Sequence, residues 1–215
     1  MAEHRLPAFG NTKVPMIVVE DVLEALIGLA SLRARSKAQI IAVTGSVGKT
    51  TTKGSPAPCS CPMSARVHAS AASFNNHWGV PLTLARMPAD VDYGVFEIGM
   101  NHHGEIRPLV KMVRSACRAD YADCTGASWP FCQSGRDCGC QGGDFLRGHR
   151  AWWLCALNRD DTRFRQLQEL AEYAGVEHIA TFGENARADY RLRDARLHPT
   201  CSCAAGERSE RMRQR

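Results

Sequence analysis

The sequence lacks any long apolar run. None of its hydrophobic stretches approaches the roughly 20 residues that a membrane-spanning helix needs, and we do not interpret residues 1–5 as the start of a secretory signal. We therefore expect a cytoplasmic protein with no membrane partner. The 44% hydrophobic content of its 215 residues is sufficient for one domain of good size with a packed core.

Lysine is scarce as well: arginine accounts for 22 of the 27 basic residues. Four of these arginines fall in the last 15 residues, where no hydrophobic periodicity indicates a folded element. We interpret the net charge of +5 as a consequence of composition rather than as a binding face, and we expect no nucleic-acid partner.

Cysteine is absent from residues 1–53, 65–114 and 156–200, although the chain contains ten cysteines. Structural zinc sites usually show paired C-x2-C spacings, whereas this sequence has only C-x-C pairs and irregular gaps. A zinc or disulfide framework is therefore disfavoured. A cysteine-rich zinc-binding module stays as an alternative, which stoichiometric metal in the isolated chain would reveal.

A glycine-rich turn is the stretch around which the rest of the chain is organised. The apolar run 39–43 leads directly into Thr44, Gly45, Ser46, Val47, Gly48, Lys49, Thr50 and Thr51. A strand that enters a glycine turn opening a helix gathers backbone N–H groups, an ammonium and a hydroxyl around one point, which suits a nucleotide phosphate and its Mg²⁺. Lys49 would neutralise the β- and γ-phosphates, and the Thr50 hydroxyl would ligate the metal. The alternative is a turn without a ligand, which requires neither the lysine nor the threonines.

Hydrophobic periodicity predicts an α/β fold with a mainly parallel sheet. Strands are predicted at 16–19, 39–43, 93–100 and 178–182, and helices from Asp21 to near Ser36, from Lys49 onward, up to Met87, over 104–113 and from Asp161 to Gly175. Glu97 falls near the carboxyl end of its strand, and in an open α/β sheet that edge faces the ligand crevice.

Periodicity is lost in three patches, at residues 54–64, 115–155 and 201–215. Three prolines within 56–62 cannot continue a helix. The second patch holds six of the cysteines and three of the four tryptophans. We expect the three patches to be disordered or misfolded.

Four blocks of the sequence resemble, in this order, the Mur ligases of bacterial cell-wall synthesis. They are residues 44–52, then Ser-Phe-Asn-Asn-His-Trp-Gly-Val-Pro-Leu at 73–82, Glu-Ile-Gly-Met-Asn-His-His-Gly-Glu-Ile at 97–106 and Asn-Arg-Asp-Asp at 158–161. The long signatures of the second and third blocks make the likeness specific. It covers residues 13–114 and 156–200, and it is greatest to the member that handles D-alanyl-D-alanine.

The resemblance implies a P-loop-type central ATP-binding domain and an ATP-dependent reaction that forms an amide bond. A carboxylate attacks the γ-phosphate of ATP, and an amine then displaces phosphate from the resulting acyl phosphate. The implied cofactors are ATP and Mg²⁺, and the implied substrates are a UDP-N-acetylmuramoyl tripeptide and D-alanyl-D-alanine. We expect a monomer.

The resemblance also implies roles for single residues. Residues 44–51 would bind the phosphates, Thr50 and Glu97 would hold Mg²⁺, Asn76 would line the phosphate and acyl site, and Asn158 would contact the adenine. Lys49, Glu97 and Asn76 are thus the catalytic candidates. From the residues alone, Glu97 could instead be a solvated strand-end carboxylate, Asn76 part of a turn, and Asn158 an ordinary helix cap.

The chain departs from the three-domain pattern of the family. We expect 1–36 to be a remnant of the N-terminal UDP-substrate domain, 37–200 the central domain, and 201–215 a tail where a C-terminal domain should follow. The family's metal-binding histidine and carbamoylated lysine motifs are missing from 115–155. We therefore expect little ligase activity from this chain, with a non-catalytic nucleotide-binding remnant as the alternative.

A shifted reading frame would explain both the missing motifs and the clustered cysteines. After the loss of one base, the codons of 137–144 can read Ile-Ala-Asp-Ala-Lys-Ala-Glu-Ile, those of 117–121 Val-Ala-Leu-Ile-Thr, and those of 127–129 His-Leu-Gly. We hypothesise that the three patches are translated out of frame. Sequencing the coding DNA around residues 54, 115, 155 and 200 tests this: the neighbouring frame should encode these motifs, and codons that do not encode them contradict the hypothesis.

Overall fold

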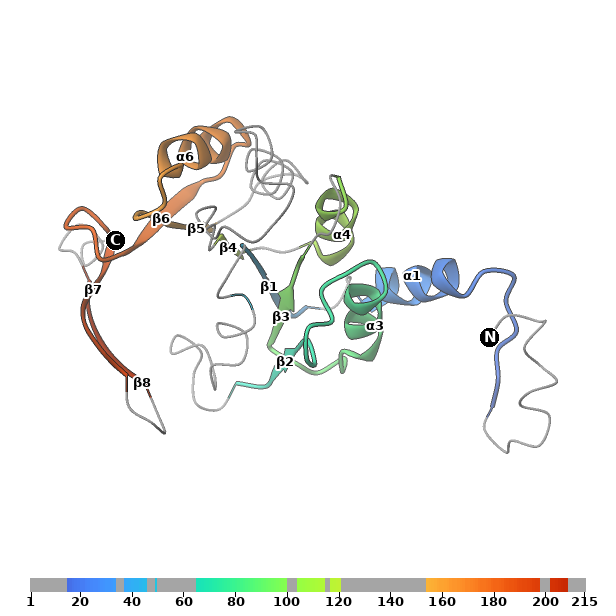
Figure 1. Cartoon of the computed structure of the whole chain (residues 1–215). Helices are drawn as coiled ribbons and strands as arrows, with labels where there is room; N and C mark the ends of the chain where they lie inside the picture. Colours follow the sequence, from blue (N-terminus) through green and yellow to red (C-terminus); the bar gives the residue numbers. More distant parts are fainter. Residues whose placement is uncertain are drawn as a thin grey trace.

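The structure is a computed structural model that describes residues 15–33, 37–45, 49, 65–99, 104–114, 117–120, 154–197 and 202–208. These residues form one eight-stranded sheet with helices packed against it (Figure 1). The elements are α1 (Val22–Arg33), β1 (Gln39–Thr44), β2 (Val67–Ala69), α3 (Gly79–Arg86), β3 (Tyr93–Glu97), α4 (Ile106–Val113), β4 (Cys117–Asp120), β5 (Leu154–Asn158), α6 (Phe164–Tyr173), β6 (His178–Gly183), β7 (Tyr190–Leu197) and β8 (Ser202–Arg208).

The strand order is β2-β3-β1-β4-β5-β6-β7-β8. Every neighbouring pair from β2 to β7 is parallel, and only β7 and β8 pair antiparallel. The predicted α/β fold with a mainly parallel sheet is confirmed. Because the chain leaves β1 to build β2 and β3 on one side and later β4 and β5 on the other, the strand order reverses at β1. Ligands of open α/β sheets bind at such a switch point, outside the carboxyl ends of the strands.

The main core lies where α1, α3 and α4 pack near β1 and β3 (Figure 1). Its largest fully buried apolar side chains include Phe96 of β3 and Leu84 of α3. Gly94 leaves room for Phe96 and Ile40, because a Cβ there would come within 2.8 Å of Ile40 and 2.9 Å of Phe96. A second, smaller cluster joins β5 to α6 through Cys155, Leu157, Phe164, Leu167 and Ala171.

Several predicted element ends are confirmed. The Glu24 N–H donates to Asp21 Oδ1 (2.8 Å), so Asp21 caps α1 as expected. Gly175 follows α6 with a φ of 75°, which suits glycine at a helix end. α1 is described up to Arg33, and residues 34–36, where its end was predicted, lie outside the described part.

Two predicted strand bounds are wrong. Residues 16–18 belong to no strand and their side chains are exposed, and of the predicted strand 16–19 only Val19 makes an isolated β-bridge. β3 ends at Glu97 rather than at residue 100, because the Gly99 N–H donates to the Asn75 carbonyl (2.9 Å) instead of continuing the ladder.

Strands also occur where the sequence shows no periodicity. β4 and the first residues of β5 fall within 115–155, and β8 falls within 201–215, so the expectation of disorder is wrong at these positions. β4 is paired on both sides, to β1 and to β5, and β8 pairs with β7 through its backbone. Backbone pairing sustains these strands without an alternating side-chain pattern. Within the three patches, residues 54–64, 115–116, 121–153, 201 and 209–215 lie outside the described part.

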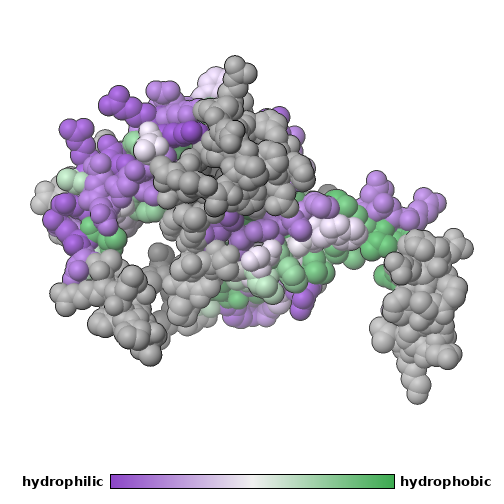
Figure 2. All heavy atoms as spheres, in the orientation of Figure 1, coloured by the Kyte–Doolittle hydropathy of each residue, from purple (hydrophilic) through white to green (hydrophobic). Residues whose placement is uncertain are grey.

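Apolar residues gather over α1 in the view of Figure 2, and polar residues gather around α6. The exposed apolar side chains of α1 include Val22, Leu29 and Leu32. Within the described segments, no helix has the length and apolarity to cross a membrane.

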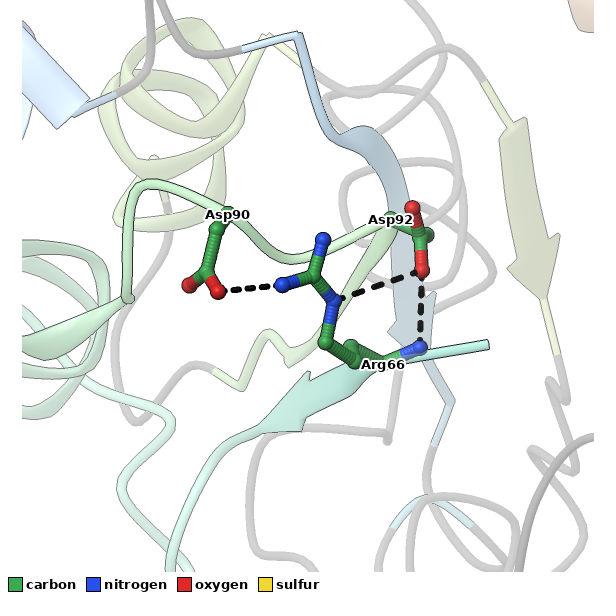
Figure 3. Close-up of polar contacts among 3 residues, drawn as sticks. All are labelled: Arg66, Asp90 and Asp92. Atoms are coloured by element: carbon green, nitrogen blue, oxygen red, sulfur yellow. Dashed lines mark hydrogen bonds and ion pairs between the residues drawn. The ribbon is translucent and has the colours of Figure 1, made fainter. Parts of the chain in front are cut away.

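Arg66 aligns the amino ends of β2 and β3, at the edge opposite the carboxyl ends of the strands. Its backbone N–H donates to Asp92 Oδ2 (2.8 Å), and its guanidinium faces Asp90 and Asp92 (Figure 3). The side chains of this group are about half exposed or more. Solvent therefore weakens these ion pairs.

We predict that stability depends on the core far more than on this surface group. Leu84→Ala should lower the free energy of unfolding by about 2–5 kcal/mol, because it opens a cavity among α1, α3 and α4. Arg66→Ala is the control and should cost about 1 kcal/mol or less. Urea unfolding followed by circular dichroism measures both variants, and equal losses would contradict this account of the core.

Candidate functional site

The carboxyl end of β1 is tied to the end of β3 by three contacts. Val43 is in register with Glu97, the Ile98 N–H donates to the Val43 carbonyl (2.8 Å), and the buried Thr44 hydroxyl donates to the Ile98 carbonyl (2.9 Å). Thr44, a predicted phosphate ligand, therefore joins two strands with its hydroxyl. These contacts bring the start of the glycine stretch beside Glu97.

Gly45 opens the glycine stretch with a φ of 135°, a conformation that side-chain-bearing residues rarely adopt. Lys49 is helical, and its ammonium donates back to the Gly45 carbonyl. The predicted phosphate residues 46–48, 50 and 51 lie outside the described part, so the roles of Thr50 and its neighbours stay predictions.

The ammonium of Lys49 is half-buried between the start of the turn and Glu97. Burial lowers the pKa of Lys49 below its ordinary value of 10.5, and the Glu97 charge opposes this by raising it, with burial the larger effect. Lys49 and Glu97 are thus close enough to interact electrostatically, as the sequence predicts for two residues at one phosphate site.

Glu97 is 1% exposed, so the alternative of a solvated strand-end carboxylate is wrong. Its Oε1 accepts a hydrogen bond from Asn75 Nδ2 (2.8 Å), and its backbone N–H donates to the Ser70 hydroxyl (3.4 Å). Buried carboxylates require such partners, because burial of an unpaired charge is costly. Neither Asn75 nor Ser70 was predicted as a site residue.

The two adjacent asparagines have separate tasks. Asn76 Oδ1 accepts from the backbone N–H groups of Trp78 (3.1 Å) and Gly79 (2.9 Å), so this exposed side chain caps the first turn of α3. Asn75, not Asn76, reaches Glu97. The placement of Asn76 at a phosphate and acyl site stays a prediction. Helix capping was a readable sequence signal, since asparagine three residues before Gly79 is a common helix start.

Asn158 lies at the end of β5, at the same sheet edge as Glu97. Its Oδ1 accepts from the Asp160 N–H (3.0 Å), and the Asp160 carboxylate accepts in turn from the Asn185 N–H (2.9 Å), which joins the ends of β5 and β6. Asp161 Oδ1 accepts from the Arg163 N–H (2.7 Å) ahead of α6. The contact at the start of α6 is therefore made by Asp161 and not by Asn158, which the alternative interpretation treated as a helix cap. The contact of Asn158 with adenine stays a prediction.

The described residues at this edge bring together the Lys49 ammonium, the positive-φ Gly45 and the buried Glu97 carboxylate. Among the described residues, no group of three or more histidine, cysteine, aspartate or glutamate side chains could hold a metal ion by itself.

Comparisons with known proteins indicate the class of protein that this chain is similar to. Residues 43–122 match the model of the Mur ligase middle domain. The crystal structure of MurF from Acinetobacter baumannii superposes with a TM-score of 0.71 at 26% sequence identity, covering 92% of this chain and 43% of that chain. Over residues 43–122 the chain is therefore similar to the middle domain of the Mur ligase family.

Within that family, the relatives it matches share one name. The UDP-N-acetylmuramoyl-tripeptide–D-alanyl-D-alanine ligase of Rickettsia prowazekii is 31% identical over 183 residues, which are 85% of this chain and 40% of the relative. The enzyme of the same name from Escherichia coli is 37% identical over 102 residues, 47% of this chain and 22% of the relative. The chain thus spans less than half the length of these relatives. MurF of Thermotoga maritima in complex with ADP shares the fold, with a TM-score of 0.67 at 19% identity.

We predict that phosphate binding at Lys49 takes up a proton at alkaline pH. The pKa of Lys49 is lowered in the free chain, and a bound phosphate anion raises it again. Between these two pKa values, the affinity for ADP should fall by up to about tenfold per pH unit as pH rises. Isothermal titration calorimetry in two buffers of different ionisation enthalpy measures the proton uptake. Lys49→Ala is the control that should remove it, and an affinity that stays constant up to pH 10 would contradict the prediction.

Proposed function

We propose that this chain binds MgATP as the middle domain of an ATP-dependent ligase that joins D-alanyl-D-alanine to a UDP-N-acetylmuramoyl tripeptide. One observation carries the proposal: the Lys49 ammonium donates to the Gly45 carbonyl within electrostatic reach of the buried Glu97 carboxylate, at the switch point of the parallel sheet. The names of the relatives supply the substrate class. The role fits a cytoplasmic monomer without a membrane or nucleic-acid partner.

The phosphates of ATP would lie against Gly45 and Lys49, where backbone groups and one positive charge oppose their negative charge. Asn158, at the same sheet edge, would contact the adenine. Thr50 would supply a hydroxyl to the metal from the turn that follows Lys49.

The residues present fit Mg²⁺. This ion typically takes one or two protein oxygens and completes its octahedron with phosphate oxygens and water. Glu97 supplies one buried carboxylate at the sheet edge where the phosphates would lie. When bound, Mg²⁺ would neutralise the charge that develops on the transferred phosphoryl group.

The proposed reaction balances in two steps. A carboxylate oxygen of the tripeptide bonds to the γ-phosphorus, and the bond from that phosphorus to the bridging oxygen breaks, so ADP leaves with the bond's electron pair. The amine nitrogen of D-alanyl-D-alanine then attacks the acyl carbon, loses a proton and expels inorganic phosphate. Lys49 would align the γ-phosphate and neutralise part of its negative charge in the first step. Phosphoryl transfer depends mainly on such alignment and charge neutralisation.

A second candidate function is nucleotide binding without ligation. It is favoured by residues 115–155, where the family's metal-binding histidine and carbamoylated lysine motifs are missing. We infer that this chain by itself retains nucleotide binding and performs little ligation.

Calorimetric titration with ADP, with and without Mg²⁺, tests the proposal. We expect saturable binding that Mg²⁺ tightens, because the phosphates and Glu97 would share the ion. Lys49→Ala should weaken binding about tenfold or more in both conditions, and Glu97→Gln should remove only the tightening by Mg²⁺.

A ligation assay distinguishes the two candidates. The amide product is measured by mass spectrometry, with the Escherichia coli ligase as the positive control. We expect ADP binding with little product above background. A chain that binds no ADP overturns the proposed function, and a chain with normal turnover overturns the inferred impairment.

A further inference from the structure

We propose that Asn75 is a positioning residue that holds the Glu97 carboxylate in the orientation needed to ligate Mg²⁺. Its Nδ2 donates to Glu97 Oε1 over 2.8 Å. Because an ionised carboxylate only accepts hydrogen bonds, the amide nitrogen of Asn75 must be the atom that faces it. The inference rests on the proposed function, since it assigns a task within the same nucleotide site.

Glu97 needs a partner that fixes it without cancelling its charge. The carboxylate is buried, and the Lys49 ammonium is near enough to attract it. If the Glu97 carboxylate formed a close ion pair with Lys49, each charge would neutralise the other. The ammonium would then attract a phosphate less strongly, and the carboxylate would attract a metal ion less strongly. The neutral amide of Asn75 instead donates to Oε1, which fixes the carboxylate and leaves its negative charge in place.

Asn75 is itself fixed by its backbone. Its N–H donates to the Ser73 carbonyl (2.8 Å), and its carbonyl accepts from the Gly99 N–H (2.9 Å). The next residue, Asn76, caps α3. The carboxamide of Asn75 is therefore presented from a braced segment between β2 and α3, rather than from a side chain that must find its own position.

Gly99 provides the space that the Asn75 side chain occupies. A Cβ at position 99 would lie 2.9 Å from Asn75 Nδ2 and 3.0 Å from Asn75 Cγ. Real Cβ atoms are very seldom this close to a neighbour, so Gly99→Ala must displace the carboxamide. Among the described residues, the positive-φ glycines do not include Gly99, so alanine at this position acts through the steric contact and not through backbone strain.

This geometry gives a test with two independent variants. For each protein, ADP affinity is measured by calorimetry with Mg²⁺ and with EDTA, and the ratio of the two affinities is the Mg²⁺ gain. Asn75→Ala should reduce the Mg²⁺ gain about tenfold or more, as loss of a group that orients a metal ligand typically does. Its affinity in EDTA should stay within about twofold of the parent chain.

Gly99→Ala should reproduce the effect while leaving Asn75 in the sequence. The double variant should equal Asn75→Ala alone, because alanine at 99 then has no carboxamide to displace. Thr83→Ala is the matched control: it removes a buried hydrogen bond to the Gly79 carbonyl inside α3, and it should lower thermal stability without changing the Mg²⁺ gain.

Each outcome decides between the alternatives. An Mg²⁺ gain that Asn75→Ala leaves intact overturns the assignment, and so does a loss of equal size in Mg²⁺ and in EDTA, which would indicate a purely structural role. Additive losses in the double variant also contradict it. A parent chain without any ADP binding overturns the proposed function, and with it this inference.

Discussion

The site depends on the parallel pairing of β1 with β3, which continues to the carboxyl ends of both strands. The hydrogen bonds from the Ile98 N–H to Val43 and from the Thr44 hydroxyl to Ile98 set the register in which Glu97 ends beside the glycine turn. A shift by one residue would rotate every side chain of β3 to the opposite face. Glu97 would then leave the Lys49 ammonium, and Phe96 would leave the core.

The pairing of β1 with β3 also places a charged side chain, Glu97, in a buried position. Glu97 is held in a nearly water-free position by the amide of Asn75 and by the field of Lys49. In such surroundings a charge interacts more strongly with a phosphate or a cation than it would in water. Fixing the carboxylate before a ligand arrives reduces the ordering that binding must impose.

The central part of the fold could be predicted because local signals agreed with the tertiary context. The continuous apolar run of β1 reflects a strand with neighbours on both sides. Glu97 was predicted near the carboxyl end of its strand, where the structure places it, and its role at a nucleotide site stays a prediction. The cap at Asp21 and the helix end at Gly175 depend on local backbone chemistry alone.

The remainder depends on contacts between distant residues. The hydrogen bond from Asn75 to Glu97 spans 22 positions, and nothing in an asparagine pair indicates which member caps a helix and which reaches across. β4 is a strand because β1 and β5 pair with it on both sides. Residues 16–18 show the reverse case, in which β-branched and apolar residues of strand-like composition form no strand.

We propose that Lys49 and Glu97 belong to one nucleotide site. A crystal structure of the chain with ADP and Mn²⁺, with the ion located by its anomalous scattering, tests it most directly. We expect the β-phosphate against the Lys49 ammonium and an anomalous peak between that phosphate and the Glu97 carboxylate. A nucleotide bound elsewhere, or a peak with no contact to Glu97, would contradict it.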